Sequence, residues 1–193
     1  GGEKAWKAVN DMTSSYTTDM QGMTLTIKTV KKAPNKMMLD VTAMGQSFQK
    51  IVFNGTTGYM SAQGQKKDFT SEEAKEYAEQ ARMTEELDYL SAGYKIELKG
   101  IEKVDNEDAY MIEVTRPSGG KVNEYYQVKS GLKVKSEQVD EEGTQTTYYL
   151  DYKPGAGNLM YPNLIKQNMG PQMMELKFQS VEINTNVSED MFK

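Results

Sequence analysis

Hydrophobic and polar residues alternate along most of this chain, a pattern typical of β-strands that bury one face. The alternation is clear at residues 23–28 and again at residues 37–43. After residue 93, turn candidates recur every 12 or 13 residues. This spacing predicts an antiparallel meander, in which each strand neighbours the next. The strands expected there include Ala109–Arg116, Val122–Val128, Leu132–Val139 and Gln145–Tyr152.

One hairpin has a specific turn signal. The stretch IVFNGTTGYM, residues 51–60, interrupts two apolar runs with Asn54 and Gly55. Both residue types tolerate the positive φ that a two-residue hairpin turn requires. We therefore expect residues 47–53 and 56–62 to pair as antiparallel strands around this turn.

Two segments have the spacing of a helix instead. Apolar residues in Glu3–Met12 fall on one helical face. A second helical stripe begins after Thr70, which lies three residues before Glu73 and so has the pattern of a capping box. We expect one long helix or two short ones between residues 71 and 91, ended by Gly93.

Near the end of the chain, the alternation changes phase. Met174, Leu176 and Phe178 occupy even positions, whereas Val181 and Ile183 occupy odd ones. A strand that keeps one buried face can absorb this change with a β-bulge, which we expect near residues 179–180. A final capped turn at residues 188–192 is expected to bury Phe192.

Together these elements predict the α+β class. We expect a single domain, residues 1–193, built on a curved antiparallel meander sheet that forms an incomplete β-barrel. Its concave face must be covered, and the N-terminal helix and the central helical insertion are the natural cover. At 37% hydrophobic residues, the chain can build such a core if each strand buries only one face.

Composition excludes several functions. The chain has no histidine and no cysteine, which removes Ser-His-Asp and Cys-His catalysis and the usual zinc sites. A net charge of −5 without a basic block argues against nucleic-acid binding. No apolar run is long enough to span a bilayer, so we expect association with a membrane to be peripheral at most.

Carboxylates leave one catalytic alternative open. Acidic residues cluster at Asp105, Glu107 and Asp108 and again at residues 140–142. Both clusters fall on predicted turns, where acidic residues are normally just solvated, and nothing places two of them across a cleft. We therefore expect no enzyme activity, no catalytic residues, no metal ligands and no cofactor, and rank a carboxylate-dependent hydrolase last.

The order of the elements resembles the LolA-like superfamily of bacterial outer-membrane lipoprotein carriers, over nearly the whole chain. The sequence is also similar to LolA-like segments that follow insulinase-type zinc peptidase domains. LolA proteins carry an arginine on an early strand, but residues 36–39 of this chain contain none, which favours a relative that uses the same scaffold. The segments that carry the resemblance are Gln21–Leu25, Lys32–Lys36, Phe53–Met60, Lys103–Tyr110, Tyr125–Leu132 and Val181–Asn184.

The resemblance implies a non-enzymatic protein of the periplasm or outer membrane that shelters the acyl chain of a lipoprotein or another apolar ligand. The alternative is a non-catalytic accessory domain of a larger envelope protein, with a peptidase domain upstream as its partner. The first residue is not methionine, so we expect either a mature form or a segment of a longer chain. Fourteen methionines, which suit surfaces that adapt to varied apolar partners, fit a pocket for acyl chains, although ordinary core filling explains them as well. The residues expected to line the apolar cavity are Met23, Leu25, Met37, Leu39 and Phe53 from the sheet and Tyr77, Ala81 and Leu87 from its helical cover.

Overall fold

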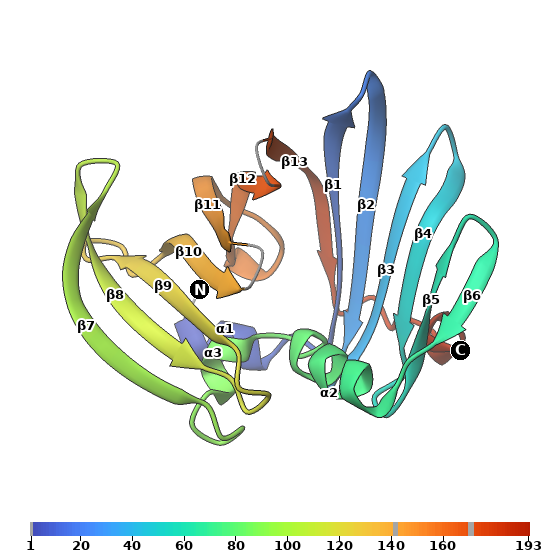
Figure 1. Ribbon diagram of the computed structural model, residues 1–193, viewed down its shortest axis with the longest axis horizontal. Coiled ribbons are helices and arrows are strands. Elements are labelled where there is room, and N and C mark those ends of the chain that lie inside the picture. Colours follow the sequence, from blue (N-terminus) through green and yellow to red (C-terminus); the bar gives the residue numbers. More distant parts are fainter. Residues whose placement is uncertain (1, 141–142, 170–171) are drawn as a thin grey trace. The chain divides into compact units, whose positions relative to one another are not determined.

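The computed structural model describes residues 2–140, 143–169 and 172–193, and of these it leaves out the side chains of residues 139, 140 and 169 (Figure 1). Its main element is an antiparallel sheet of thirteen strands. The strands are β1 (Asp11–Met20), β2 (Met23–Lys32), β3 (Lys36–Ala43), β4 (Gln46–Phe53), β5 (Gly58–Ala62), β6 (Gln65–Asp68), β7 (Lys95–Val104), β8 (Glu107–Thr115), β9 (Lys121–Gln127), β10 (Lys133–Asp140), β11 (Gly143–Pro154), β12 (Met160–Met169) and β13 (Gln172–Ile183).

Helices are few and short. They are α1 (Gly2–Lys7), α2 (Ser71–Gln80) and α3 (Glu85–Asp88), with 3₁₀ turns η1 (Ala156–Asn158) and η2 (Glu189–Phe192). The central insertion is thus two helices. The capping box is confirmed, because the Thr70 side chain accepts from the Glu73 N–H and the Glu73 carboxylate accepts from the Thr70 N–H.

The strand order is β6-β5-β4-β3-β2-β1-β13-β12-β11-β10-β9-β8-β7. Two meanders, β1–β6 and β7–β13, therefore join where the first strand pairs with the last. Among the described residues β6 and β7 each lack a second neighbour, so the sheet is not closed into a barrel. This confirms the α+β antiparallel class, although the predicted meander is interrupted at the helical insertion.

The chain forms two compact units. The first unit comprises residues 1–85, 153–161 and 177–193, and the second comprises residues 86–152 and 162–176. Each unit has apolar clusters of its own, so each is described separately below.

In the first unit, α2 covers one face of the sheet, here called the helix face. Ala81, the C-cap residue that follows α2, is buried together with Met37 of β3 and Phe53 of β4. Tyr77 packs on this cluster, and its ring stacks on Phe69 at a centroid distance of 4.2 Å. The cluster is apolar and closely packed, so α2 is held to the sheet by burial of its apolar stripe.

The N-terminal helix is shorter than predicted. It ends at Lys7, and Met12 belongs to β1 instead. The backbone N–H of Asn10 donates to the side chain of Asn184, and pairing with β2 begins at Asp11. From Asn10 onward the backbone therefore bonds to other segments, and not to the preceding turn of the helix. Trp6 still packs with buried Val9 and with Tyr161, as the apolar spacing requires.

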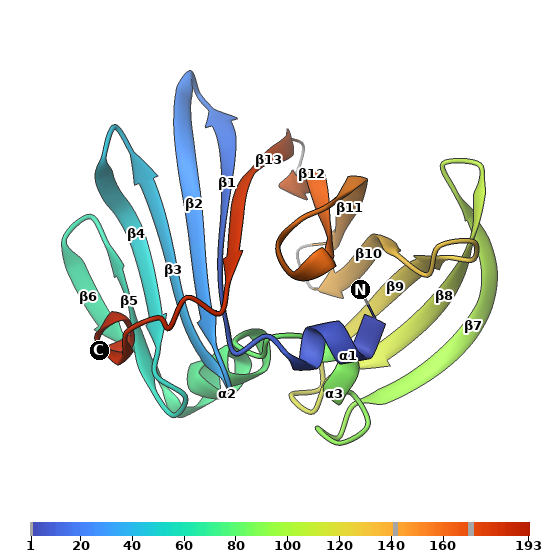
Figure 2. The same cartoon turned by 180° about the vertical axis from the view of Figure 1, so that it is seen from behind.

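The other face of the same strands is covered by the C-terminal segment, which crosses them in the view from behind (Figure 2). Phe192 and Val187 are buried against Val30, Met38 and Val52. The prediction that Phe192 turns inward is confirmed. At the end of β2–β4 where α2 covers the helix face, the C-terminal segment thus covers the opposite face.

Two local predictions have different outcomes. The bulge is confirmed, because Ser15 pairs with Ser180 and Tyr16 with Phe178, which leaves Gln179 as the extra residue. The strands flanking Asn54 pair as expected, but the two-residue turn is wrong: four residues, 54–57, connect them. The Asn54 side chain accepts from the N–H groups of Thr56 and Thr57, each at 3.0 Å, and this side-chain turn replaces the tighter one.

In the second unit, residues 86–94 pack on strands β8 and β9. Tyr89 and Tyr94 lie with their ring centroids 4.9 Å apart and are buried against Val114 and Val122. The four strands predicted between residues 109 and 152 are present as β8–β11, within a few residues of the expected bounds.

Candidate functional site

Uncharged side chains continue along the helix face beyond α2. Because residues paired directly across strands share a face, the register defines cross-strand rows. One row pairs Ser14, Thr29, Leu39, Ile51 and Met60, and the next pairs Tyr16, Ile27, Val41 and Gln49. Every member of these two rows is half-buried and none is charged. We call these nine residues the apolar rows.

The row that precedes them lies under the helix. It contains Met12, Lys31, Met37 and Phe53, of which Met37 and Phe53 are buried in the α2 cluster. The Lys31 ammonium donates to the carbonyl oxygen of Arg82 at 2.8 Å and so ties the segment after α2 to strand β2. The helix therefore covers one end of the strands, and β2–β4 extend beyond it (Figure 1).

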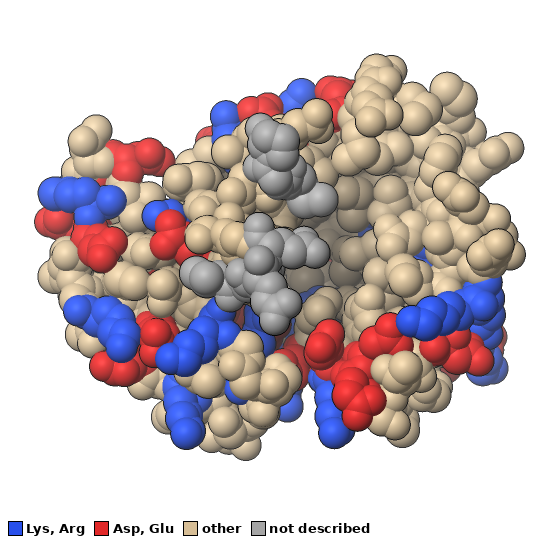
Figure 3. Space-filling view, in the orientation of Figure 1, with Lys and Arg blue, Asp and Glu red and all other residues tan. Residues whose placement is uncertain are grey.

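The space-filling view agrees with this distribution. The surface over β2–β4 is mostly uncharged, whereas Lys, Asp and Glu gather over α2 and β6 (Figure 3). The apolar rows contain no carboxylate and no amine, so they offer neither acid–base groups nor ion pairs to a bound molecule. They can contribute apolar contacts and a few hydroxyl and amide groups.

Most of the predicted cavity residues lie on this face. Met23 and Leu25 alternate with the same period as Ile27, so the five predicted sheet residues all belong to the helix face. Tyr77 and Ala81 approach it from α2. Met23 is exposed at the β1–β2 hairpin, Leu25 and Leu39 are half-buried, and Leu87 belongs to the second unit.

Two aromatic residues outside the predicted cavity set complete the face. Tyr16 and Phe178 meet edge to face with centroids 5.6 Å apart, and Phe178 also stacks near Tyr161 at 6.2 Å. The sequence could have identified Ile27 and Val41 as residues of this face, since they continue the alternation of their strands. Phe178 had the same kind of signal, since it continues the alternation of Met174 and Leu176. Its contact with Tyr16 had none, because 162 positions separate the two residues and only the pairing of β1 with β13 joins them.

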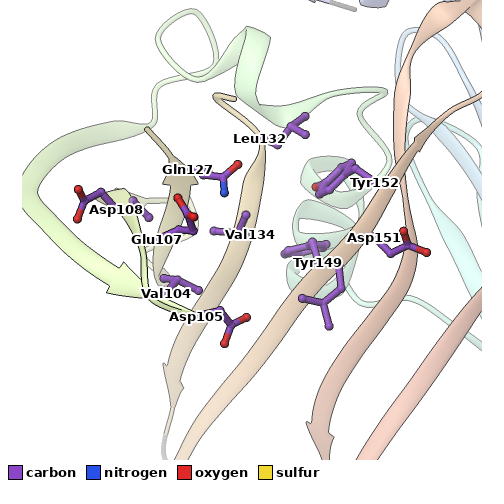
Figure 4. A pocket seen from close by; sticks show the side chains of 12 residues that line it. Val104, Asp105, Glu107, Asp108, Gln127, Leu132, Val134, Tyr149, Asp151 and Tyr152 are labelled. Carbon is purple, nitrogen blue, oxygen red and sulfur yellow. The ribbon is translucent and has the colours of Figure 1, made fainter. Parts of the chain in front are cut away.

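The second unit contains a separate pocket of about 280 Å³ (Figure 4). Val104, Ala109 and Val134 belong to its apolar wall, and Tyr149 and Tyr152 come from β11. Four carboxylates also line it, from Asp105, Glu107, Asp108 and Asp151.

These carboxylates are mostly engaged with neighbours. Glu107 pairs with Lys129 at 2.8 Å, Asp108 pairs with Lys103 at 2.8 Å, and Asp151 accepts from Asn163. Such pairing suits solvated turn residues and not a reactive pair with divided protonation states. The second predicted acidic cluster, residues 140–142, lies outside the described side chains.

A buried ionic network lies under residues 86–94 of the second unit. The Glu124 carboxylate accepts from Tyr89, Tyr126 and Lys133 at 2.6–2.8 Å, and Lys133 also pairs with Glu86 at 2.6 Å. Burial alone would lower the pKa of Lys133, but the two facing carboxylates outweigh it and raise that pKa. Burial and the adjacent Glu124 raise the pKa of Tyr126. Both groups therefore keep their protons, and the network acts as a fixed link between strands and the covering segment.

The described residues lack two further features. They contain no group of three or more Asp or Glu side chains placed to hold a metal ion. Among them, too, no helix is long and apolar enough to cross a membrane.

Comparison with known proteins identifies the fold. No protein-family model and no curated protein matches the sequence. A DUF1329 family protein from Desulfovibrio piger matches in structure with a TM-score of 0.68 and 12% identity, over 98% of this chain and 92% of that one. A LolA superfamily protein from Nitrosomonas europaea matches with a TM-score of 0.66 and 16% identity, over 95% and 89% of the two chains.

A third solved structure agrees with these two. A domain described as an outer membrane lipoprotein-sorting protein, from Vibrio parahaemolyticus, has a TM-score of 0.64 and 12% identity, over 97% of this chain and 90% of that one. At these identities the likeness concerns the fold. The resemblance to the LolA-like fold inferred from the sequence is thereby confirmed.

Proposed function

We propose that this protein is a non-enzymatic binding protein of the cell envelope that shelters an acyl chain or another apolar ligand on its helix face. The observation that carries the proposal is the continuation of uncharged, half-buried side chains beyond the end covered by α2. The LolA-like fold supports it, because one structure that shares the fold is described as a lipoprotein-sorting protein. A periplasmic or outer-membrane-associated location belongs to the same proposal.

The energetics suit an acyl chain. Removing a methylene from water contributes about 0.8 kcal/mol, so a chain with about ten buried methylenes gains roughly 8 kcal/mol before the costs of association. Tyr16, Ile27, Leu39 and Val41 supply a continuous apolar surface along three neighbouring strands. A hydrocarbon chain needs no more specific chemistry than this, which agrees with the lack of charge in the apolar rows.

The direct test is displacement of a fluorescent fatty acid, followed by native mass spectrometry of protein purified from cells. The informative variant is Leu39→Asn, which places an amide in the apolar rows. Its matched control is Asp40→Asn, one residue further along β3 and therefore on the other face. We expect Leu39→Asn to weaken binding about tenfold, a change of about 1.4 kcal/mol, and the control to bind like the parent protein. The proposal fails if the parent protein binds no fatty acid or if both variants bind equally well.

A second candidate function is an accessory domain of a larger envelope protein such as an insulinase-type zinc peptidase. The observation that favours it is the tight packing of α2, because buried Met37, Phe53 and Ala81 form an ordinary core. Reading the full gene separates the two: a peptidase domain upstream would support the accessory role. Absence of such a domain, together with fatty-acid binding by the parent protein, would reject it.

A further inference from the structure

The two edges of the sheet differ in a way that monomer stability does not explain. The edge strand β6 has only four residues, Gln65–Asp68, all of them exposed and three of them charged. Short, charged edges prevent pairing with other chains. The other edge strand, β7, has ten residues, and three of its apolar side chains are exposed: Ile96 by 45%, Leu98 by 62% and Ile101 by 58%.

A β-bulge keeps these three side chains on one face. Leu98 pairs with Ile112 and Gly100 pairs with Met111, so Lys99 is the extra residue of β7. Without the bulge, Ile101 would point away from Ile96 and Leu98. With it, Ile96, Leu98 and Ile101 lie opposite Val114, Ile112 and Tyr110 respectively, on a single face of the second unit.

The other face of β7 carries mostly charged side chains. Lys95, Glu97 and Glu102 are exposed there. Glu97 is paired with Lys99 at 3.0 Å, but neither Lys95 nor Glu102 has an ion-pair partner in the described part of the chain. The edge therefore combines unpaired backbone groups, an exposed apolar face and two uncompensated charges of opposite sign.

We propose that β7 pairs in an antiparallel manner with β7 of a second copy of this chain. The two-fold axis passes between Leu98 and Lys99. Each Lys95 then lies opposite Glu102 of the other copy, and each Ile96 lies opposite Ile101. The two-fold symmetry makes every one of these contacts twice.

The charge pattern selects this register. A shift by one residue places side chains from opposite faces across from one another, for example Lys95 against Ile101 or against Lys103. A shift by two residues in one direction places Glu97 opposite Glu102, and these like charges repel each other. A shift by two residues in the other direction places Glu97 opposite Leu98, although the two side chains lie on opposite faces of the strand. Only the central register matches face with face and charge with opposite charge at both ends. The interface is separate from the apolar rows and goes beyond the proposed function.

Analytical ultracentrifugation of the whole chain, from about 1 to about 300 µM, tests association by mass action. We expect the average mass of the parent protein to rise with concentration toward that of two chains. Lys95→Glu and Glu102→Lys should each weaken the dimer about tenfold or more, because each creates two like-charge pairs. The double variant Lys95→Glu/Glu102→Lys should restore it. Lys66→Glu on the other edge is the matched control and should dimerise like the parent protein.

A disulfide experiment tests the register itself, since the chain has no cysteine of its own. Lys95→Cys/Glu102→Cys should form a covalent dimer on mild oxidation. Lys95→Cys/Lys103→Cys, one residue out of register, should not. In each variant at least six residues of extended strand lie between the two cysteines of one chain, too far for an internal disulfide. A parent protein that stays monomeric throughout, or a double charge variant that behaves like the single ones, would overturn the proposal.

Discussion

The ammonium group of Lys133 lies 2.6 Å from the carboxylate of Glu124, and the two side chains are only 19% and 6% exposed. The pair joins neighbouring strands β10 and β9. Tyr89 donates to the same carboxylate from the segment that covers these strands. A single buried acceptor thus links the sheet of the second unit to its cover.

Removing the cation from this pair should be strongly destabilising. We expect Lys133→Met to lower the free energy of unfolding by about 3–5 kcal/mol, because it leaves the Glu124 carboxylate buried without a cation. Urea unfolding measures the loss. Glu124→Gln/Lys133→Met is the control, and its loss should be smaller because no buried uncompensated charge remains; Glu86, the other partner of Lys133, is exposed. A loss below about 1 kcal/mol for the single variant would mean that the pair behaves like an exposed one.

Gly58 should not tolerate a side chain. A Cβ atom at this position would lie 2.0 Å from the carbonyl oxygen of Val52 and 2.7 Å from the Phe69 ring. We expect Gly58→Ala to cost about 1–3 kcal/mol or more, since backbone cannot move away as a flexible side chain would. Thermal and urea unfolding measure the effect. Gly120→Ala has open space around its Cβ and serves as control, and equal stability of the two variants would contradict the prediction.

The hydrogen bonds of Glu73 at the start of α2 should make stability depend on pH at the acidic end. A hydrogen bond from Lys67, followed by those from the backbone and side chain of Thr70, lowers the pKa of Glu73 from 4.5 to about 2. Because the pKa of Glu73 is lower in the folded state than in the unfolded state, ionised Glu73 stabilises the fold, and this stabilisation is fully present above the unfolded-state pKa. It is lost as the pH falls through about 4.5 toward 2.

Glu73→Gln removes the titrating group and keeps a side chain able to accept from the Thr70 N–H. The variant should therefore lose less stability than the parent protein between about pH 5 and pH 2. Urea unfolding at several pH values measures the slope of the free energy of unfolding against pH for the parent protein and for the variant. Identical slopes would show that Glu73 does not contribute to acid sensitivity.

The C-terminal turn should contribute substantially to the first unit. Phe192 is 2% exposed and packs with Val30, Met38 and Val52. We expect Phe192→Ala to cost about 3–5 kcal/mol through lost burial and the cavity left behind. Lys193→Ala removes only an exposed ion pair with Asp190 and should change stability by about 1 kcal/mol at most. Unfolding curves of the two variants that coincide would refute a structural role for this turn.

Local signals in the sequence predicted local structure well. The phase change between Phe178 and Val181 identified the bulge at Gln179, and the Thr70–Glu73 spacing identified the start of α2. Alternation placed Met37, Leu39 and Phe53 on one face of the sheet. The prediction of the turn after Phe53 was wrong because the Asn54 side chain accepts hydrogen bonds from the backbone, and this arrangement competes with the two-residue turn; both suit the same residue types.

Only the tertiary structure decided the contacts between distant segments. The sequence by itself determined which residues of each strand share a face and where strands and helices begin, since these depend on neighbours within a few positions. It could not determine that Tyr16 meets Phe178, that Lys133 neutralises Glu124 or that the C-terminal turn covers Val30. Those contacts depend on which strands become neighbours, and the pairing of β1 with β13 is selected by burial summed over the whole sheet and not by any local pattern.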